Sequence, residues 1–571
     1  MNKINDFIKL FQKKDKILLS LVFVSTFLVS AFESISLGSL AGYIMIISDT
    51  EAFINKIPFE NIKNFAASIS LEKFIVISSV LLVIIFILKN LLILFFNFVN
   101  IWIEKRILVN LSKELLNFYL RKRYSFHLVN NPNNLINSII SETARGLSFI
   151  FTIINLLREV LVIIILFTSI FFINYNLALL IVLSMGLASV IFFFNIKNIL
   201  KKLGLEAKIF SEIRLKKLSE TFGVVKLIKI FNANDYFLNQ FNKVNIKKIS
   251  IDNKVRFYTF IPRAFLEVVA IFTISMTTFY FIYNDYSMVS VIPTLSLLAI
   301  LLVRAVPAFG VINVSASVLQ YHNQSMNFIL DEFKNNKNNT EFTDYPKGVN
   351  NNNSINSIEL KNLSFSYPGS NKIILSDINL ELLKGDFVGI KGESASGKST
   401  LIDIILGLLE PSKGQVIINK KSDIKLYEIN NQNIGYVPQD VYLTDDTLKN
   451  NIALGVSEDA INEEKIIKIL RLLKLEEILS NNGIYSELGN RGIRLSGGQR
   501  QRIGIARALY RDPEVLILDE ATNALDDETE KNVINEIKKF KKNMITIMIT
   551  HRISNFKDCN KILNVKDGFL I

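Results

Sequence analysis

Long apolar runs are concentrated before residue 335, whereas the rest of the chain alternates short apolar and polar stretches. A helix needs about 20 apolar residues to cross a bilayer. Six segments meet this requirement, and we expect each to form a membrane-spanning helix. The candidate spans are 17–47, 74–101, 147–173, 177–195, 257–283 and 289–312.

Two long polar segments, 103–146 and 197–256, separate the second span from the third and the fourth from the fifth. Within 201–249, apolar residues recur every three or four positions, which predicts helices that extend the spans. The phrases 126–128 and 231–235 interrupt these runs. We interpret them as short helices at the loop tips that touch a cytoplasmic domain; the alternative is a plain solvated turn.

The pattern changes at Ile358, where short strand-like runs begin to alternate with helical ones. Such alternation predicts an α/β domain with a largely parallel sheet. The stretch before it is rich in Asn and Lys and has no apolar period, which is typical of a linker. We therefore expect a transmembrane domain over 1–334, a linker over 335–357 and an α/β domain over 358–571.

The 571-residue chain has a formal net charge of +13. Nucleic-acid binding could explain this charge, but Lys and Arg flank the apolar spans in alternation, which favours a membrane protein with basic cytoplasmic loops. We expect no nucleic-acid partner, and the positive-inside rule places both termini in the cytoplasm. The chain has one cysteine, Cys559, and three histidines, so neither an internal disulfide nor a cysteine or histidine metal cluster is expected.

Charged residues also lie within the apolar spans, where each would cost roughly 2.5–3.5 kcal/mol at mid-membrane. They are Glu33, Lys89, Arg158, Glu159, Arg263, Glu267 and Arg304. Counting along each span puts Lys89, Arg158 and Arg304 in the cytoplasmic third. The same count puts Glu33 nearer the outer leaflet, which makes a direct pair between Glu33 and Lys89 unexpected.

One hypothesis is that Lys89, Arg158 and Arg304 form a cationic layer that faces a cavity open to the inner leaflet. Such a layer would bind a substrate with a phosphate-bearing head group. The alternative is that these side chains snorkel to the interface or pair with Glu159 and Glu267.

A phosphate-binding pattern, G-x-x-x-x-G-K-[ST], lies between a strand-like run, 387–390, and a helix-like run, 401–406. Its residues are Gly392, Glu393, Ser394, Ala395, Ser396, Gly397, Lys398, Ser399 and Thr400. The glycines allow backbone N–H groups to surround phosphates at a helix N-terminus. In an ATP site, Lys398 would reach the β- and γ-phosphates and Ser399 would hold Mg²⁺.

A second run, 515–518, is an apolar strand that delivers Asp519 and Glu520 at its carboxyl end, where sheet ligands bind. Asp519 would hold Mg²⁺ through water, and Glu520 would act as a general base toward the attacking water. A buried strand with acidic caps is the alternative, and the phosphate loop upstream argues against it.

A third motif, Leu-Ser-Gly-Gly-Gln at 495–499, precedes a basic helix-like run. With the phosphate loop and the acidic strand end, it resembles the ATP-binding cassette (ABC) superfamily across essentially the whole C-terminal domain. The resemblance implies that Ser496, Gly497, Gly498 and Gln499 bind the ATP held by a second cassette.

The same resemblance implies roles for four other residues. Tyr367 would stack on adenine, and Gln439 would link Mg²⁺ and water to the membrane domain. Asp526 would lie in the loop that crosses the dimer interface, and His551 would contact the γ-phosphate. The segment 487–492 is similar to a short motif of exporters that touches the coupling loops. Asn523 stands where serine is more usual, a departure from which we expect little consequence.

Six spans followed by one cassette resemble exporter-type half-transporters. The expected fold is thus a six-span α-helical transmembrane domain of the ABC exporter type fused to an α/β P-loop nucleotide-binding domain. The resemblance implies a homodimer in the bacterial inner membrane that uses ATP and Mg²⁺ and works by alternating access. The six spans exclude a soluble cassette ATPase of DNA repair or translation.

Three phrases, 31–36, 293–299 and 304–307, are similar to bacterial lipid-linked oligosaccharide flippases. They imply an amphipathic, lipid-linked or anionic-headed substrate that contacts membrane lipids. Peptides, drugs and lipid A-type lipids remain alternative cargoes. A cassette-type channel or regulator is a further alternative, although such proteins often have a degenerate catalytic site.

Overall fold

The computed structural model describes residues 2–48, 54, 63, 68, 70–171, 175–284, 288–334, 354–370, 372–422, 434–479, 482–489, 492–539 and 544–571. The chain forms two compact units. One comprises Met1–Lys122 and Val129–Glu341, and the other comprises Arg123–Leu128 and Phe342–Ile571. Most of the predicted linker lies outside the described residues.

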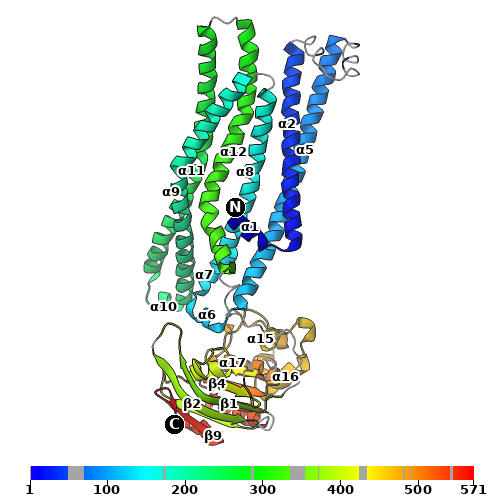
Figure 1. The fold of residues 1–571 in the computed structure, drawn as a ribbon. Helices are drawn as coiled ribbons and strands as arrows, with labels where there is room; N and C mark the ends of the chain where they lie inside the picture. Colours follow the sequence, from blue (N-terminus) through cyan, green and yellow to red (C-terminus); the bar gives the residue numbers. More distant parts are fainter. Residues whose placement is uncertain are drawn as a thin grey trace. The chain divides into compact units, whose positions relative to one another are not determined.

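The first unit is built from long helices, six of which, in the described part of the chain, are long and apolar enough to cross a membrane (Figure 1). They are α2 (Lys13–Ser48), α5 (Leu71–Leu120), α8 (Thr143–Phe171), α9 (Tyr175–Gly223), α11 (Asn234–Tyr283) and α12 (Met288–Lys334). The six predicted spans are confirmed. The predicted extensions are confirmed as well, because α5, α9 and α11 continue without a break through the polar segments next to the spans.

The long helices pack in a defined pattern: α8 packs against α12, α9 packs against α11 and α12, and α2 packs against α5 and α8. Met185, Leu266 and Leu298 are buried in the core shared by α9, α11 and α12. In contrast, none of the most apolar stretch of α5 is buried within the unit. That stretch, which includes Leu94 at 65% exposure, is available to lipid tails or to another chain.

Short helices stand near the two predicted loop tips. At the first tip, α6 (Tyr124–Val129) and α7 (Pro132–Asn137) lead through a π-helical turn, Ser138–Glu142, into α8. At the second tip, α10 (Val225–Ile230) ends before the predicted phrase. A tight turn with Asn232 at φ 50° then enters α11, so the helix lies just upstream of the expected position.

A further helix, α1 (Asn2–Lys9), was not predicted. Its Phe7 is fully buried, and a Cβ at Gly146 of α8 would lie 3.5 Å from the Phe7 ring. The Asp6 carboxylate pairs with Lys334 of α12 at 2.5 Å. These contacts attach the N-terminal helix to α8 and α12.

The second unit contains two sheets. The larger has the strand order β10-β9-β3-β8-β7-β6, and all of its neighbouring strands pair in parallel except β10 with β9. Its strands are β3 (Phe387–Gly392), β6 (Ile434–Val437), β7 (Val515–Asp519), β8 (Ile545–Ile549), β9 (Lys561–Lys566) and β10 (Phe569–Leu570). The predicted, largely parallel core sheet is confirmed.

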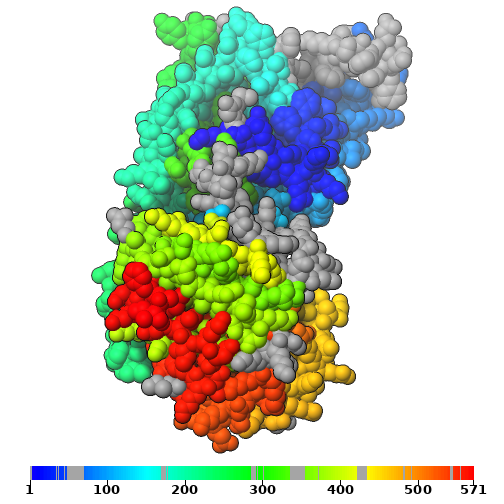
Figure 2. Space-filling view, turned by 60° about the horizontal axis from the view of Figure 1, so that its bottom comes forward, coloured from blue at the N-terminus to red at the C-terminus, as the bar shows by residue number. Residues whose placement is uncertain are grey.

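The smaller sheet is antiparallel, with the order β2-β1-β4-β5. Its strands are β1 (Ser357–Ser366), β2 (Ile373–Leu383), β4 (Lys413–Ile418) and β5 (Lys421–Ser422). The C-terminal strands, red in Figure 2, lie at the surface beside this sheet, and β10 contacts β2. The two sheets share one apolar core with α13 (Lys398–Ile405).

A second core lies on the other face of the larger sheet. It is formed with α15 (Leu448–Ile452), α16 (Glu463–Leu472), α17 (Gly497–Tyr510) and α18 (Asp527–Lys539). Every residue of β7 and β8 is buried, as expected for parallel strands covered on both faces. The rigid central strands therefore carry the loops at their carboxyl ends, where the motif residues lie.

Candidate functional site

The phosphate loop runs from the end of β3 at Gly392 to the start of α13 at Lys398. Gly392 has φ 156° and Gly397 has φ 106°, a region that favours glycine. A Cβ at Gly392 would lie 2.4 Å from the carbonyl oxygen of Val565. Both glycines are therefore required by the path of the backbone, as the sequence pattern predicts.

Two side chains of this loop point to its centre. Lys398 is 8% exposed, and its Nζ donates to the carbonyls of Gly392 at 2.8 Å and Glu393 at 2.7 Å. The hydroxyl of Ser396 is buried and has no hydrogen-bond partner in the described part of the chain. A loop with an unpartnered hydroxyl and a lysine held by its own carbonyls has donors available for a phosphate.

Tyr367 lies next to the first turn of α13. Its hydroxyl is 3.2 Å from Oγ1 of Thr400, and its ring meets that of Phe365 edge to face, with centroids 5.0 Å apart. The aromatic residue selected from the sequence is thus beside the phosphate loop.

Asp519 ends β7 and is 9% exposed. Burial raises the pKa of this carboxyl; the neighbouring Glu520 raises it further, and Lys398 lowers it. Within the described ranges, no hydrogen bond or ion pair reaches the Asp519 carboxylate. A buried carboxylate without a partner is costly, so this position fits a cation.

Among the described residues, three side chains contact the carboxylate of Glu520. Its Oε2 accepts from Nε2 of Gln439 at 3.0 Å and from Nδ2 of Asn523 at 2.8 Å. Its Oε1 lies 3.2 Å from Nε2 of His551. The structure therefore brings Gln439 and His551, both selected from the sequence, to the carboxylate of the predicted general base Glu520, and adds Asn523 to them.

The backbone of Glu520 has φ 50°, which is unusual for a residue with a side chain and costs of order 1–3 kcal/mol. Surrounding bonds hold it there. Its N–H donates to the carbonyl of Ile549 at 3.1 Å, and its carbonyl accepts from the N–H of Asn523 at 3.2 Å. The buried Gln501 of α17 donates to the same carbonyl at 3.4 Å and accepts from the N–H of Ala524 at 2.8 Å.

Hydrogen bonds also connect the segment after Glu520 to Arg552, the residue that follows His551. Arg552 donates to the carbonyls of Asn523 at 3.4 Å and Leu525 at 3.0 Å. Sequence reasoning missed Gln501 and Arg552, which no motif marks. For Asn523 the signal was present, because this residue departs from the usual serine. The expectation that the departure has little consequence stays a prediction, and the structure adds a direct contact of Asn523 with Glu520.

The Leu-Ser-Gly-Gly-Gln motif forms the start of α17. The Ser496 hydroxyl accepts from the N–H of Gln499 at 3.1 Å, and the Gln499 side chain accepts from the N–H of Ser496 at 2.9 Å, which makes a capping box. Gly497 and Gly498 form the first turn, where a Cβ on Gly498 would lie 3.0 Å from the carbonyl oxygen of Ala524. Among the residues described, no hydrogen bond joins this motif to the phosphate loop.

Asp526 precedes α18 and accepts from the N–H of Thr529 at 2.9 Å. The hydrogen bonds from Thr529 lower the pKa of the Asp526 carboxyl. Within one chain this residue therefore caps a helix, and its predicted place at a dimer interface stays a prediction.

In the first unit, charged side chains from three helices meet between apolar segments. Arg304 of α12 pairs with Glu33 of α2 at 2.5 Å and with Glu159 of α8 at 3.4 Å. Arg158 pairs with Glu159 at 3.0 Å. We call these four residues the intramembrane ion network. The Nε of Arg304 is buried and has no partner among the described residues.

This network differs from the predicted cationic layer. Both arginines pair with carboxylates, as the alternative interpretation expected. The carboxylates are those of Glu159 and Glu33, whereas the alternative named Glu159 and Glu267. Glu267 instead pairs with Arg263 at 3.1 Å. Lys89 makes a different contact, with its ammonium 4.8 Å from the centre of the Phe86 ring.

The placement of Glu33 nearer the outer leaflet than Arg304 is also wrong, because the two side chains touch. The count was made from the presumed inner end of the first span. The helix α2 has 36 residues, more than a bilayer requires, so its inner end is a poor reference for depth.

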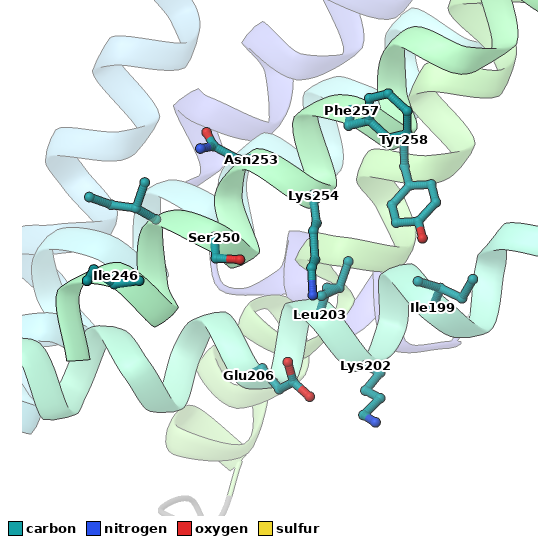
Figure 3. Close-up of a pocket in the computed structure, with 11 residues that line it drawn as sticks. Ile199, Lys202, Leu203, Glu206, Ile246, Ser250, Asn253, Lys254, Phe257 and Tyr258 are labelled. Atoms are coloured by element: carbon teal, nitrogen blue, oxygen red, sulfur yellow. The ribbon is translucent and has the colours of Figure 1, made fainter. Parts of the chain in front are cut away.

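A groove of about 830 Å³ lies between α9 and α11, and none of its lining residues belongs to the intramembrane ion network. Figure 3 shows Lys254 of α11 and Glu206 of α9 directed toward the space between the helices, with Phe257 and Tyr258 at one end. Its lining combines both signs of charge with apolar side chains.

Comparison with known proteins gives consistent matches. A family described as ABC transporter matches residues 375–523. A Desulfotalea psychrophila protein named ATP-dependent lipid A-core flippase is 32% identical over 464 residues, 79% of this chain and 78% of the relative. A Rickettsia prowazekii protein named as an export ATP-binding/permease protein is 29% identical over 497 residues, 81% of each chain.

The fold is also similar to a solved structure, that of a bacterial Atm1-family ABC exporter with ATP bound. The TM-score is 0.77, and the similarity covers 97% of this chain and 94% of that one. The sequence identity is 20%, so the likeness concerns the fold.

Proposed function

This chain belongs to the ABC transporter family as an exporter-type half-transporter that hydrolyses ATP, and from that premise we propose that it flips a lipid-linked substrate with an anionic head group. The observation that carries the substrate class is the intramembrane ion network, in which two arginines lie inside otherwise apolar helices. Charged residues at such depth are expensive and usually functional. The relative named as a lipid A-core flippase supports a lipid cargo.

We assign the hydrolysis step to Glu520. Its carboxylate accepts a proton from water as the water oxygen bonds to the γ-phosphorus of ATP and the bond to the ADP oxygen breaks, giving ADP and phosphate. Gln439 and His551, at 3.0 Å and 3.2 Å from the carboxylate, hold its orientation.

We assign ATP binding to the phosphate loop and Tyr367. The backbone N–H groups from Gly392 to Thr400 and the ammonium of Lys398 would bind the phosphates. In exchange, Lys398 would give up its bonds to the loop carbonyls of Gly392 and Glu393. The ring of Tyr367 would stack on the adenine.

The residues present fit Mg²⁺, which prefers oxygen ligands. The buried Asp519 carboxylate, which lacks a partner in the described ranges, would hold it with the hydroxyl of Ser399 and the side-chain oxygen of Gln439. The ion would neutralise charge on the phosphates during hydrolysis.

A complete site requires two chains. The motif at Ser496–Gln499 makes no hydrogen bond to the phosphate loop of its own chain among the residues described, and one chain has one of each. We propose a homodimer in which the motif of each copy closes on the ATP of the other, near Asp526. The exposed apolar stretch of α5 is a further surface that the second chain would cover in the dimer. Nucleotide binding then biases the paired helices between inward and outward access.

We propose that an anionic head group displaces Glu33 and Glu159 from Arg304, whose Nε–H is a donor without a partner in the described part of the chain. Arg158 would be the second positive side chain to contact the head group, and Lys89 would contact it from α5. The basic segments between spans place both termini in the cytoplasm, and the bacterial relatives favour the inner membrane.

The test uses purified protein in liposomes, with lipid-linked oligosaccharide pyrophosphates, lipid A-type lipids, peptides and drugs offered separately. We expect the lipid-linked pyrophosphate to stimulate ATPase activity and to be flipped by the unaltered protein. The Glu520→Gln variant should neither hydrolyse ATP nor flip this lipid. Arg304→Ala should keep basal ATPase activity and lose stimulation. Stimulation by peptides or drugs alone would overturn the substrate class, and ATP binding without hydrolysis in the unaltered protein would indicate a regulator.

A further inference from the structure

Asn523 makes a contact that its family resemblance does not explain. Its Nδ2 donates to Oε2 of Glu520 at 2.8 Å, the shortest of the three side-chain contacts to that carboxylate. We propose that Asn523 is a positioning residue that orients Glu520 for ATP hydrolysis. The inference rests on the role proposed above for Glu520.

The arrangement of donors indicates which oxygen receives the proton. A carboxylate oxygen offers two lone-pair sites. On Oε2 of Glu520 both are taken, by Gln439 at 3.0 Å and by Asn523 at 2.8 Å. Among the described residues, the one side chain in contact with Oε1 is His551, at 3.2 Å, so one site of this oxygen remains for the attacking water. Asn523 thus sets the plane of the carboxylate and directs Oε1 to the reaction.

The three side chains that contact the Glu520 carboxylate differ in how they are linked to Glu520 along the chain. Gln439 follows β6 and His551 follows β8, so both reach Glu520 from other segments. Asn523 lies in the same turn, and its N–H donates to the carbonyl of Glu520 at 3.2 Å. Its amide is therefore linked to Glu520 by the turn itself, independently of the segments that carry Gln439 and His551.

The backbone around Asn523 is fixed from two further sides. Arg552 donates to the carbonyls of Asn523 and Leu525, and Gln501 accepts from the N–H of Ala524. A serine at position 523 would have a shorter side chain whose hydroxyl both donates and accepts. The amide is longer and its nitrogen only donates, which makes it the better partner for an ionised carboxylate.

The experiment compares Asn523→Ala and Asn523→Ser with the unaltered protein and with Asn535→Ala, an exposed asparagine of α18. All four are assayed for kcat and KM with Mg-ATP, for ATP affinity and for thermal unfolding. Loss of one hydrogen bond to a charged group predicts about a tenfold lower kcat for Asn523→Ala, with KM within about twofold. Asn523→Ser should recover part of kcat, and Asn535→Ala should match the unaltered protein.

A structural role alone would lower the unfolding temperature and ATP affinity and would leave the kcat of the folded fraction unchanged. A folded Asn523→Ala variant with kcat within twofold of the unaltered protein would overturn the inference. Glu520→Gln, measured alongside, distinguishes a failure of the role proposed for Glu520 from a failure of the inference about Asn523. If Glu520→Gln hydrolyses ATP normally, the role of Glu520 fails and the inference fails with it. If Glu520→Gln is inactive while Asn523→Ala is unimpaired, only the inference fails.

Discussion

Arg304 and Glu33 form an ion pair, 2.5 Å between Nη2 and Oε1, that joins α12 to α2 within the apolar part of the bundle. Glu33 is about 15 residues from the end of α2 at Ser48, and Arg304 is about 16 residues from the start of α12 at Met288, roughly 22–24 Å in each case. The two residues thus lie at matching depth. Together with Glu159 and Arg158 they sum to no net charge, so a bound anion must compete with carboxylates that are already in place.

Arg304→Ala is expected to destabilise the membrane unit by about 3 kcal/mol, because it leaves Glu33 and Glu159 buried without their shared partner. Glu33→Gln should cost less, since Arg304 retains Glu159 at 3.4 Å. Thermal unfolding of the purified protein in detergent measures both effects.

Lys89→Met provides the control for removal of a positive charge within the spans. Among the described residues Lys89 makes no ion pair, and its ammonium lies over the Phe86 ring. We expect at most a small loss of stability. Equal unfolding temperatures for Arg304→Ala and Lys89→Met would contradict a stabilising ion network.

Gly204 is a point of close approach between α9 and α12. A Cβ there would lie 2.4 Å from the carbonyl oxygen of Tyr321, which is backbone and cannot swing aside. Gly204→Ala should therefore separate the two helices and cost about 1–3 kcal/mol, read as a lower unfolding temperature.

Gly186 lies in the same helix and is the matched control. A Cβ at Gly186 would meet nothing within 4 Å, so Gly186→Ala should be neutral or slightly stabilising through helix propensity. If the two alanine variants unfold alike, the close contact between α9 and α12 does not limit stability.

Local patterns in the sequence predicted the spans, the helical extensions and the parallel core sheet because these follow from length and periodicity. Gly392 and Gly397 could be selected because the phosphate-binding pattern requires backbone angles that glycine adopts readily. The choice of Gln439 and His551 as site residues followed from the family resemblance, not from periodicity, and their contacts with Glu520 were not predicted.

Other features depend on tertiary contacts that no local pattern encodes. The helix α1 has 8 residues, too few to stand out by periodicity, and it is held by the burial of Phe7. The pairing of Glu33 with Arg304 required the relative depth of two helices whose ends could not be located from composition. Gln501 meets Ala524 across separate elements, so its role appears only in the folded chain.

Asp403 of α13 should make the stability of the cassette depend on pH. Burial, aided by the charge of Asp519, raises the pKa of Asp403 from 3.8 to about 6. A carboxyl with a raised folded-state pKa stabilises the fold fully below about pH 4, and this contribution is lost as pH rises through about 6. Burial raises the pKa of the Tyr124 hydroxyl, and the charge of Asp403 raises it further. Burial also raises the pKa of Tyr436, followed by the charges of Asp519 and Asp403, so ionisation of Asp403 adds a charge to a partly buried region.

Asp403→Asn keeps a neutral side chain of the same shape at every pH. Without nucleotide, its unfolding temperature should match that of the unaltered protein near pH 3.5. Above pH 7 its unfolding temperature should be higher, which corresponds to about 1 kcal/mol of unfolding free energy once partial exposure is allowed for. Asp403→Ala separates packing from ionisation, because its cost in lost contacts should not vary with pH. A difference between Asp403→Asn and the unaltered protein that stays constant from pH 3.5 to 8 would show that folding does not raise the pKa of Asp403, and would contradict this prediction.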